Sequence, residues 1–181
     1  ACLLDLTGAQ RRLEIRRGDQ RGRPPGRVLS DLARLAAETV RAADDEGMRV
    51  GGIAVGVPGL VTGGLVRLAP NLGWRGVEVT AALTTRLGAL GVSVADHLVS
   101  VDNEANLAAV AELHAATQPR PSFVYISGEI GVGAGIVLDG SLLRGTRGYG
   151  GELGHVTIRP DGPLCRCGAR GCLEVYANQE T

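Results

Sequence analysis

The stretch that decides the fold reads Gly150-Gly-Glu-Leu-Gly-His155 and then, nine residues later, Cys165-Arg-Cys-Gly-Ala-Arg-Gly-Cys172-Leu-Glu174. It holds three of the four cysteines and one of the three histidines. Three thiolates and one imidazole form the closed tetrahedral donor set of a structural zinc site. The predicted zinc ligands are His155, Cys165, Cys167 and Cys172. The tight Cys-x-Cys spacing disfavours a disulfide between those two residues, and a different disulfide or unpaired buried cysteines remain the alternatives.

Two carboxylates flank these ligands. Glu152 precedes His155 by three residues, and Glu174 follows Cys172 by two. The segment has too few apolar residues to form a core, so we expect it to pin a loop whose polar groups face a pocket. The alternative is that both glutamates are solvated surface acids.

The composition limits the classes of function. The chain has 181 residues with 44% hydrophobic residues, enough for a core, and its nineteen basic residues balance nineteen acidic ones. This balance gives no global sign of a polyanion partner. Every basic residue is arginine, and a Walker-type phosphate loop requires lysine, so that class of nucleotide site is excluded.

The apolar runs and the cysteines indicate the cellular compartment of the chain. No apolar run reaches membrane-spanning length, and no secretory leader is recognisable. A thiolate zinc site fits a reducing cytoplasm. Cys2 lies in an apolar strand and is predicted to be a small core residue. Because the sequence opens on that strand and stops just after a helix begins, we expect a fragment that lacks pieces at both ends.

Apolar periodicity in the first half predicts an α/β arrangement. The expected elements are a hairpin of residues 1–7 and 11–17, helices over 27–46 and 77–90, and strands over 50–57 and 98–101. Residues 60–76 are rich in glycine and turns, and their Trp74 is expected either to fill the core or to border a pocket. Seven arginines between residues 11 and 27 are interpreted as a solvated strand edge, with contact to DNA or phosphate as the alternative.

Asp102-Asn-Glu-Ala-Asn-Leu107 follows the strand over 98–101 directly. Asn103 is a natural N-cap for a third helix, and Glu104 falls in its first turn, where the helix dipole favours an anion. This place, beyond the carboxyl end of a strand, is where open α/β sheets collect ligands. One stripe of the helix is predicted to carry Leu107, Val110, Ala111 and His114, with His114 at its surface and not a ligand.

The last third is predicted to be a second lobe. Pro119 and Pro121 suggest a hinge, and residues 123–127 and 133–138 are expected to be strands joined by Gly128-Glu-Ile-Gly131. Glycine-rich turns can expose backbone amides to a phosphate, but Glu129 at this turn would repel an anion.

Together these motifs resemble the ROK family, named for repressors, open reading frames and kinases. The segments that carry the resemblance are Gly56-Val-Pro-Gly59, Ala69-Pro-Asn-Leu-Gly-Trp74, Val101-Asp-Asn-Glu-Ala-Asn106, Gly131-Val-Gly-Ala-Gly-Ile-Val-Leu-Asp-Gly140 and the metal segment. The resemblance implies an actin-like, ribonuclease-H-like α/β fold of two lobes around a cleft that holds a sugar. The lobes would be residues 1–118 and the start of a second lobe over 119–181, with the family's first strand and C-terminal helices missing.

Carried over by position, the resemblance also implies a set of sugar-binding residues. Asn103, Glu152, His155 and Glu174 would face sugar hydroxyls, His155 while also holding zinc. Gly59 and Asn71 would line the same wall.

The chain departs from the kinase members of that family in three ways. Glu104 stands where they place a catalytic aspartate, and the misplacement of a reacting group by about 1 Å can cost roughly a hundredfold in rate. Glu129 stands where they carry a threonine, and their first phosphate loop is not recognisable. These departures resemble the regulator branch of the family, whose members carry a winged helix-turn-helix before the sugar-binding lobes.

We therefore predict the sugar-sensing, dimerising part of a transcriptional repressor, non-catalytic, with structural zinc and without ATP. Its partners would be a sugar effector, a second copy or a higher homo-oligomer, and operator DNA contacted by a module upstream of Ala1. One alternative is an ATP-dependent sugar kinase that uses Glu104 as general base. The other is a zinc-stabilised interaction module without a small-molecule ligand.

Overall fold

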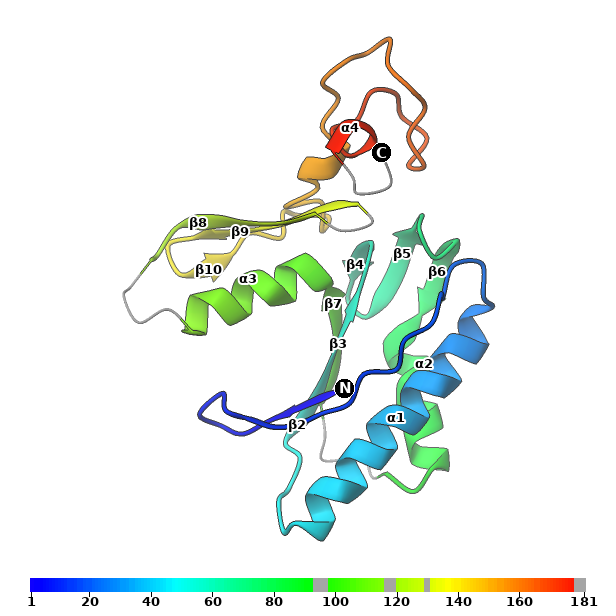
Figure 1. The fold of residues 1–181 in the computed structure, drawn as a ribbon, viewed down its shortest axis with the longest axis vertical. Coiled ribbons are helices and arrows are strands. Elements are labelled where there is room, and N and C mark those ends of the chain that lie inside the picture. The colour runs from blue at the N-terminus through cyan, green and yellow to red at the C-terminus, as the bar shows by residue number, and fades with distance from the viewer. Residues whose placement is uncertain (93–97, 116–119, 129–130, 178–181) are drawn as a thin grey trace.

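The structure is a computed structural model that describes residues 1–92, 98–115, 120–128 and 131–177 (Figure 1). The chain opens with an antiparallel hairpin of β1 (Cys2–Leu4) and β2 (Gln10–Leu13), which confirms the predicted hairpin with shorter strands. These two strands pair only with each other among the described residues. Cys2 is exposed, and its prediction as a core residue was wrong, because no further strand of the described residues extends this hairpin into a larger sheet.

Two helices cover one side of the first half. α1 (Pro25–Asp45) begins with proline in its first turn and ends before Gly47, whose φ of 73° suits glycine. α2 (Val79–Ala89) packs against α1 (Figure 1). Leu29 of α1 and Leu83 and Leu87 of α2 are almost wholly buried in the same core cluster. Both predicted helices are confirmed, with ends that differ by one or two residues.

The central layer pairs two parallel strands, β3 (Gly52–Val57) and β7 (Leu98–Asn103). Their register sets Gly56 opposite Asp102 and Val57 opposite Asn103. Both strands thus end at the same edge of the sheet, and the segments that follow them, Pro58–Gly59 and Glu104, emerge together.

Residues 60–78 form a three-stranded antiparallel sheet of β4 (Leu60–Thr62), β5 (Leu65–Ala69) and β6 (Trp74–Glu78). The sequence indicated only the turns of this segment. Its strands are three to five residues long, too short for a clear alternating pattern. Trp74 is 3% exposed and belongs to the core cluster, so the core interpretation of this residue is the correct one.

The second half stacks α3 (Glu104–Ala115) on a sheet of β8 (Phe123–Gly128), β9 (Val132–Leu138) and β10 (Ser141–Leu142) (Figure 1). Strands β8 and β9 confirm the two predicted strands. The approach of α3 is close: a Cβ on Gly135 would lie 2.6 Å from the carbonyl oxygen of Ala105.

This close approach decides which side chains of α3 are buried. The buried side chains are Ala105, Asn106 and Ala109, and Ala111 is exposed. Only small side chains fit against the glycine-bearing strand, so the larger apolar residues lie to the side. His114 is exposed, as predicted. Pro119, Glu129 and the boundary between residues 118 and 119 lie outside the described residues.

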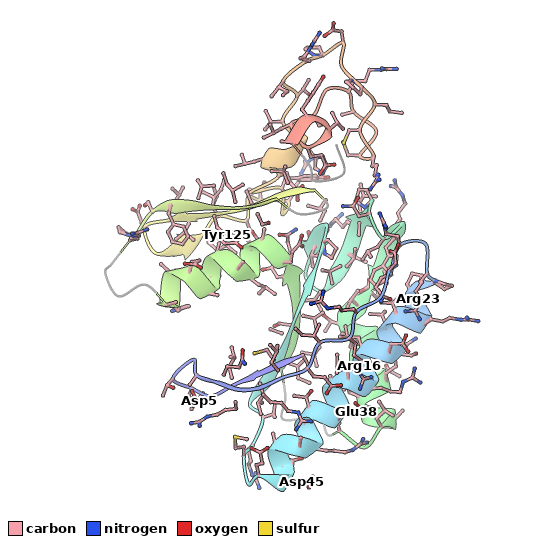
Figure 2. The ribbon with its side chains drawn as sticks, viewed as in Figure 1. Asp5, Arg16, Arg23, Glu38, Asp45 and Tyr125 are labelled. Carbon is pink, nitrogen blue, oxygen red and sulfur yellow. The ribbon has the colours of Figure 1, made fainter. Side chains whose placement is uncertain are left out.

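The arginines that follow the first hairpin form ion pairs at the surface. Arg16 pairs with Glu14 at 2.8 Å and also with Glu38 of α1, and Figure 2 labels Arg16 beside Glu38. Arg23 pairs with Asp31 at 2.8 Å. These exposed ion pairs agree with the interpretation of the stretch as a solvated strand edge and loop, and contact with DNA or phosphate stays an untested alternative. Among the described residues, none of the helices is both long enough and apolar enough to cross a bilayer.

Candidate metal centre and cleft

The metal segment is a loop held by a few backbone bonds. It runs from the short 3-10 helix η1 (Leu153–His155) to α4 (Glu174–Ala177), with isolated bridges between Thr157 and Cys172 and between Leu164 and Arg170. Gly171 has a φ of 63°, and a Cβ there would lie 1.6 Å from the carbonyl oxygen of Arg159. Only glycine allows the loop to fold back this tightly.

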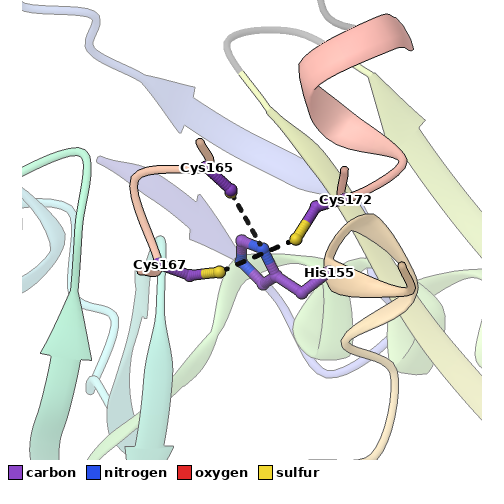
Figure 3. Close-up of side chains that lie close together, drawn as sticks. All are labelled: His155, Cys165, Cys167 and Cys172. Atoms are coloured by element: carbon purple, nitrogen blue, oxygen red, sulfur yellow. Dashed lines mark hydrogen bonds between the residues drawn. The ribbon is translucent and has the colours of Figure 1, made fainter. Parts of the chain in front are cut away.

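The four predicted ligands converge at the base of this loop (Figure 3). Their donor atoms all lie within 4.8 Å of one another. Cys165 Sγ lies 3.7 Å from His155 Nδ1, and Cys167 Sγ lies 3.8 Å from Cys172 Sγ. Two sulfurs each about 2.3 Å from a tetrahedral zinc are about 3.8 Å apart, so these separations fit that geometry. They are far too long for a disulfide bond, and all four cysteines are free.

Burial keeps two thiols of the cluster in their neutral form when no metal is bound. Burial raises the pKa of Cys165 to about 12, and burial also raises the pKa of Cys172. A bound divalent cation reverses this preference, because a coordinating thiol loses its proton. Three cysteines and one histidine therefore fit a metal of the zinc class, which would brace the loop.

His155 presents its two ring nitrogens to different surroundings. Nδ1 lies on the sulfur side, 3.7 Å from Cys165 Sγ and 3.7 Å from Glu174 Oε1. Nε2 points the other way and lies 3.9 Å from Glu152 Oε2. A metal on Nδ1 would thus leave Nε2 beside a carboxylate, and such a partner fixes the orientation and tautomer of a ligating imidazole.

A cavity of about 700 Å³ opens between the metal loop and the carboxyl ends of β3 and β7. All seven residues nominated from the sequence for sugar binding line it: Gly59, Asn71, Asn103, Glu104, Glu152, His155 and Glu174. The structure thus brings together residues that are up to 115 positions apart (174 minus 59). Their role in sugar binding remains a prediction.

The charge of the cavity is mainly negative. Removal from water raises the pKa of Glu104, and the negative charge of Glu152 adds to this rise. Desolvation raises the pKa of Glu152 too, and the positive charge that His155 can carry counteracts part of that shift. Glu104 nevertheless remains exposed on its outer side. Clustered carboxylates suit the hydroxyls of a sugar, which donate hydrogen bonds, and oppose a polyphosphate.

Asn103 joins the two strand ends. Its Oδ1 accepts hydrogen bonds from the backbone amides of Ala105 at 2.8 Å and Asn106 at 3.2 Å, which makes it the N-cap that the sequence predicted. Its Nδ2 donates to the carbonyl oxygen of Gly59 at 3.0 Å. Gly59 has a φ of 142°, and a Cβ there would lie 2.5 Å from the carbonyl oxygen of Leu68. The side-chain nitrogen Nδ2 of Asn103 carries a second hydrogen, which it can donate to a ligand.

We expect substitutions at Asn103 to separate its two structural roles, the cap on α3 and the hydrogen bond to Gly59. Asn103→Ala should lower the free energy of unfolding by about 1–2 kcal/mol, the usual cost of a lost N-cap. Asn103→Asp keeps the capping oxygen but loses the donor to Gly59, so its loss of stability should be smaller. Urea denaturation of both variants checks this order, and equal losses would contradict the division of tasks.

Glu104 allows a prediction about pH. Because folding raises its pKa, the folded state prefers the protonated carboxyl, and ionisation destabilises the fold as pH rises through that pKa. Glu104→Gln removes the ionisation. We expect the variant to be more stable than wild type at about pH 7 and the difference to shrink toward about pH 4. Urea denaturation across this range is the measurement, and a variant that is less stable at every pH would contradict it.

The cavity also contains residues that the sequence analysis missed. Residues 18–21, from the loop after β2, reach its rim. Tyr125 and Ser127 line it from β8, and Tyr125 lies on the α3 side of the sheet (Figure 2), since it pairs with Gly135, which packs on α3. The alternation of Tyr125 and Ser127 was a usable signal for a shared face. No local sequence pattern indicated that residues 18–21 would line the cavity.

The sequence of this chain is similar to those of known proteins. The sequence profile described as ROK family matches residues 4–181. The chain belongs to the ROK family. A putative xylose repressor from Caldicellulosiruptor sp. strain Rt8B.4 is 35% identical over 94% of this ROK chain and 40% of its own length. A glucokinase from Thermotoga maritima is 36% identical over 82% of this chain and 45% of its own length.

The fold agrees with this assignment. A ROK family glucokinase from Streptomyces griseus, solved in complex with glucose and AMPPNP, superposes with a TM-score of 0.76 at 31% identity. The match covers 97% of this ROK chain and 52% of the glucokinase chain. The predicted actin-like α/β fold is thus confirmed. The chain spans about half or less of the length of these relatives, and repressors and kinases resemble it to the same degree.

Proposed function

We propose that this ROK chain is the sugar-sensing part of a transcriptional repressor and does not itself transfer phosphate. The observation that carries the proposal is the convergence of Asn103, Glu152, His155 and Glu174 on one cavity beside a braced metal loop. Side chains held in place before binding lose little entropy when a sugar arrives. The repressor relative supports the regulatory part, and the metal in this proposal is zinc.

The proposed mechanism is a shift between open and closed forms of the cleft. A sugar that binds the closed form more tightly favours closure, and a homo-oligomer transmits the change to upstream DNA-binding modules. The division at residue 118, the hinge near Pro119 and Pro121, and a cytoplasmic location belong to this proposal. Neutral sugars such as D-xylose and D-glucose are the first candidates, because the names of the relatives include both.

Titration calorimetry of the zinc-loaded full-length protein is the primary test. D-xylose, D-glucose, N-acetylglucosamine and N-acetylmannosamine form the panel, and saturable heat with at least one of them is expected. A gel-shift assay with DNA from the protein's own promoter should show release by the same sugar. Absence of heat with every sugar, at one zinc per chain, would count against sugar sensing.

The second candidate is a sugar kinase, and two observations favour it. The glucokinase structure matches nearly the whole chain, and Glu104 has the raised pKa of a potential general base. A coupled assay for ADP with the same sugars distinguishes the two. Sugar-dependent ADP formation that Glu104→Gln abolishes would establish the kinase and refute the non-catalytic proposal. If sugars neither bind nor react, and Glu174→Gln changes nothing, the interaction module is favoured.

A further inference from the structure

One contact joins the metal loop directly to the opposite wall of the cleft. Arg166 Nη1 donates a hydrogen bond to Asn71 Oδ1 at 3.1 Å, between residues 95 positions apart in the chain. Arg166 lies between Cys165 and Cys167, so a metal held by these two cysteines would fix its backbone on both sides. Asn71 belongs to the turn after β5, where Leu72 donates to Ala69 at 3.1 Å.

The direction of this bond determines how Asn71 presents its amide. A guanidinium nitrogen can only donate, so the oxygen of Asn71 must face Arg166, and its nitrogen must point elsewhere. The surroundings of Gly131 show where it points. A Cβ on Gly131 would lie 3.6 Å from Asn71 Nδ2 and 2.7 Å from Glu174 Oε2. The Asn71 donor and the Glu174 acceptor therefore both lie beside Gly131, on the wall of the cavity.

We propose that Arg166 is a positioning residue of the sugar site, which holds the Asn71 amide with its donor directed into the cleft opposite Glu174. This rests on the proposed sugar-binding function. One hydroxyl can then donate to Glu174 and accept from Asn71, a pairing that a freely rotating amide would offer only part of the time. Arg166 makes the wall at Asn71 selective for an oxygen that accepts a hydrogen bond.

The first test needs no sugar and uses hydrogen exchange of the zinc-loaded full-length protein. We expect Arg166→Met to accelerate exchange of the Leu72 and Gly73 amides by roughly threefold or more, because their turn loses its anchor. Asn71→Asp keeps an oxygen for Arg166 and should retain protection. Arg170→Met, in the same loop, is the matched control and should exchange like wild type. Unchanged exchange in Arg166→Met would overturn the proposal.

The second test measures affinity for D-xylose and D-glucose by calorimetry at equal zinc content. Arg166→Met should bind about fivefold more weakly than wild type, the effect of one ordinary hydrogen bond. Asn71→Ala and Asn71→Asp should both weaken binding, since each lacks the donor. The double variant Arg166→Met, Asn71→Ala should bind no more weakly than Asn71→Ala alone, because Arg166 acts through Asn71.

The outcomes distinguish the positioning role of Arg166 from the proposed binding of a sugar. Additive losses in the double variant would overturn the positioning role, since Arg166 would then act on the sugar without Asn71. Full affinity in Arg166→Met would overturn it as well. If wild type binds neither sugar, the proposed function fails for these ligands, while the hydrogen exchange of Arg166→Met still decides whether Arg166 anchors the Asn71 turn.

Discussion

Cys172→Ser should remove the metal and cost this ROK protein the order of its loop from residue 156 to residue 174. Cys172 is completely buried and its sulfur lies 3.8 Å from that of Cys167, so the substitution removes one of the four donors from the cluster. Structural zinc contributes about 10–16 kcal/mol in isolated zinc-finger peptides. Even a third of that value should lower the melting temperature of the chain by about 7–20 °C.

Elemental analysis and thermal melting together measure this effect. Wild type should hold one zinc per chain, and Cys172→Ser should hold less and melt earlier. Chelation of the wild-type protein should reproduce the lower melting temperature. Cys2→Ser is the matched control, because Cys2 is exposed and lies outside the cluster. Wild-type protein without stoichiometric metal, or Cys172→Ser with a full complement of zinc, would refute the metal centre.

Glu152→Gln should reduce sugar affinity by about 10- to 100-fold, the effect expected for loss of a charged hydrogen-bond acceptor. The substitution keeps the size of the side chain and removes the charge that faces both the cavity and His155 Nε2 at 3.9 Å. Calorimetry with the sugar that wild type binds measures the loss. Zinc content should remain at one per chain, because Glu152 is not one of the four metal ligands.

Asp161→Asn is the control for a general effect of charge. Asp161 is exposed in the same loop and pairs only loosely with Arg159, at 3.7 Å. The Asp161→Asn variant should bind sugar with the same affinity as wild type. If Glu152→Gln instead bound sugar as tightly as wild type, Glu152 would not contact the sugar. Its role would then be limited to orienting His155.

The cluster of one histidine and three cysteines could be predicted from the sequence because its ligands are local. Four ligands within eighteen residues (155 to 172), with glycines between them, limit the possible geometries severely. The capping role of Asn103 was predictable for the same reason, since its acceptor and donors are neighbours in the chain. The gathering of Gly59, Asn103 and Glu174 in one cavity required the family resemblance, because no local pattern brings such distant residues together.

The errors also have physical causes. Strands β4, β5 and β6 were missed because short strands between tight turns carry little periodic signal. The buried face of α3 could not be predicted because burial there follows the space left by Gly135 and not the size of the side chain. Residues 18–21 line the cavity through long-range packing of a charged loop, which its composition did not indicate.

The tight seating of α3 on β9 has a mechanical consequence. A Cβ added at Gly135 would lie 2.6 Å from the carbonyl oxygen of Ala105, so α3 and β9 touch through their backbones. Any movement about the proposed hinge near Pro119 and Pro121 would have to break this contact between α3 and β9. We therefore expect the contact to limit how far the cleft can open.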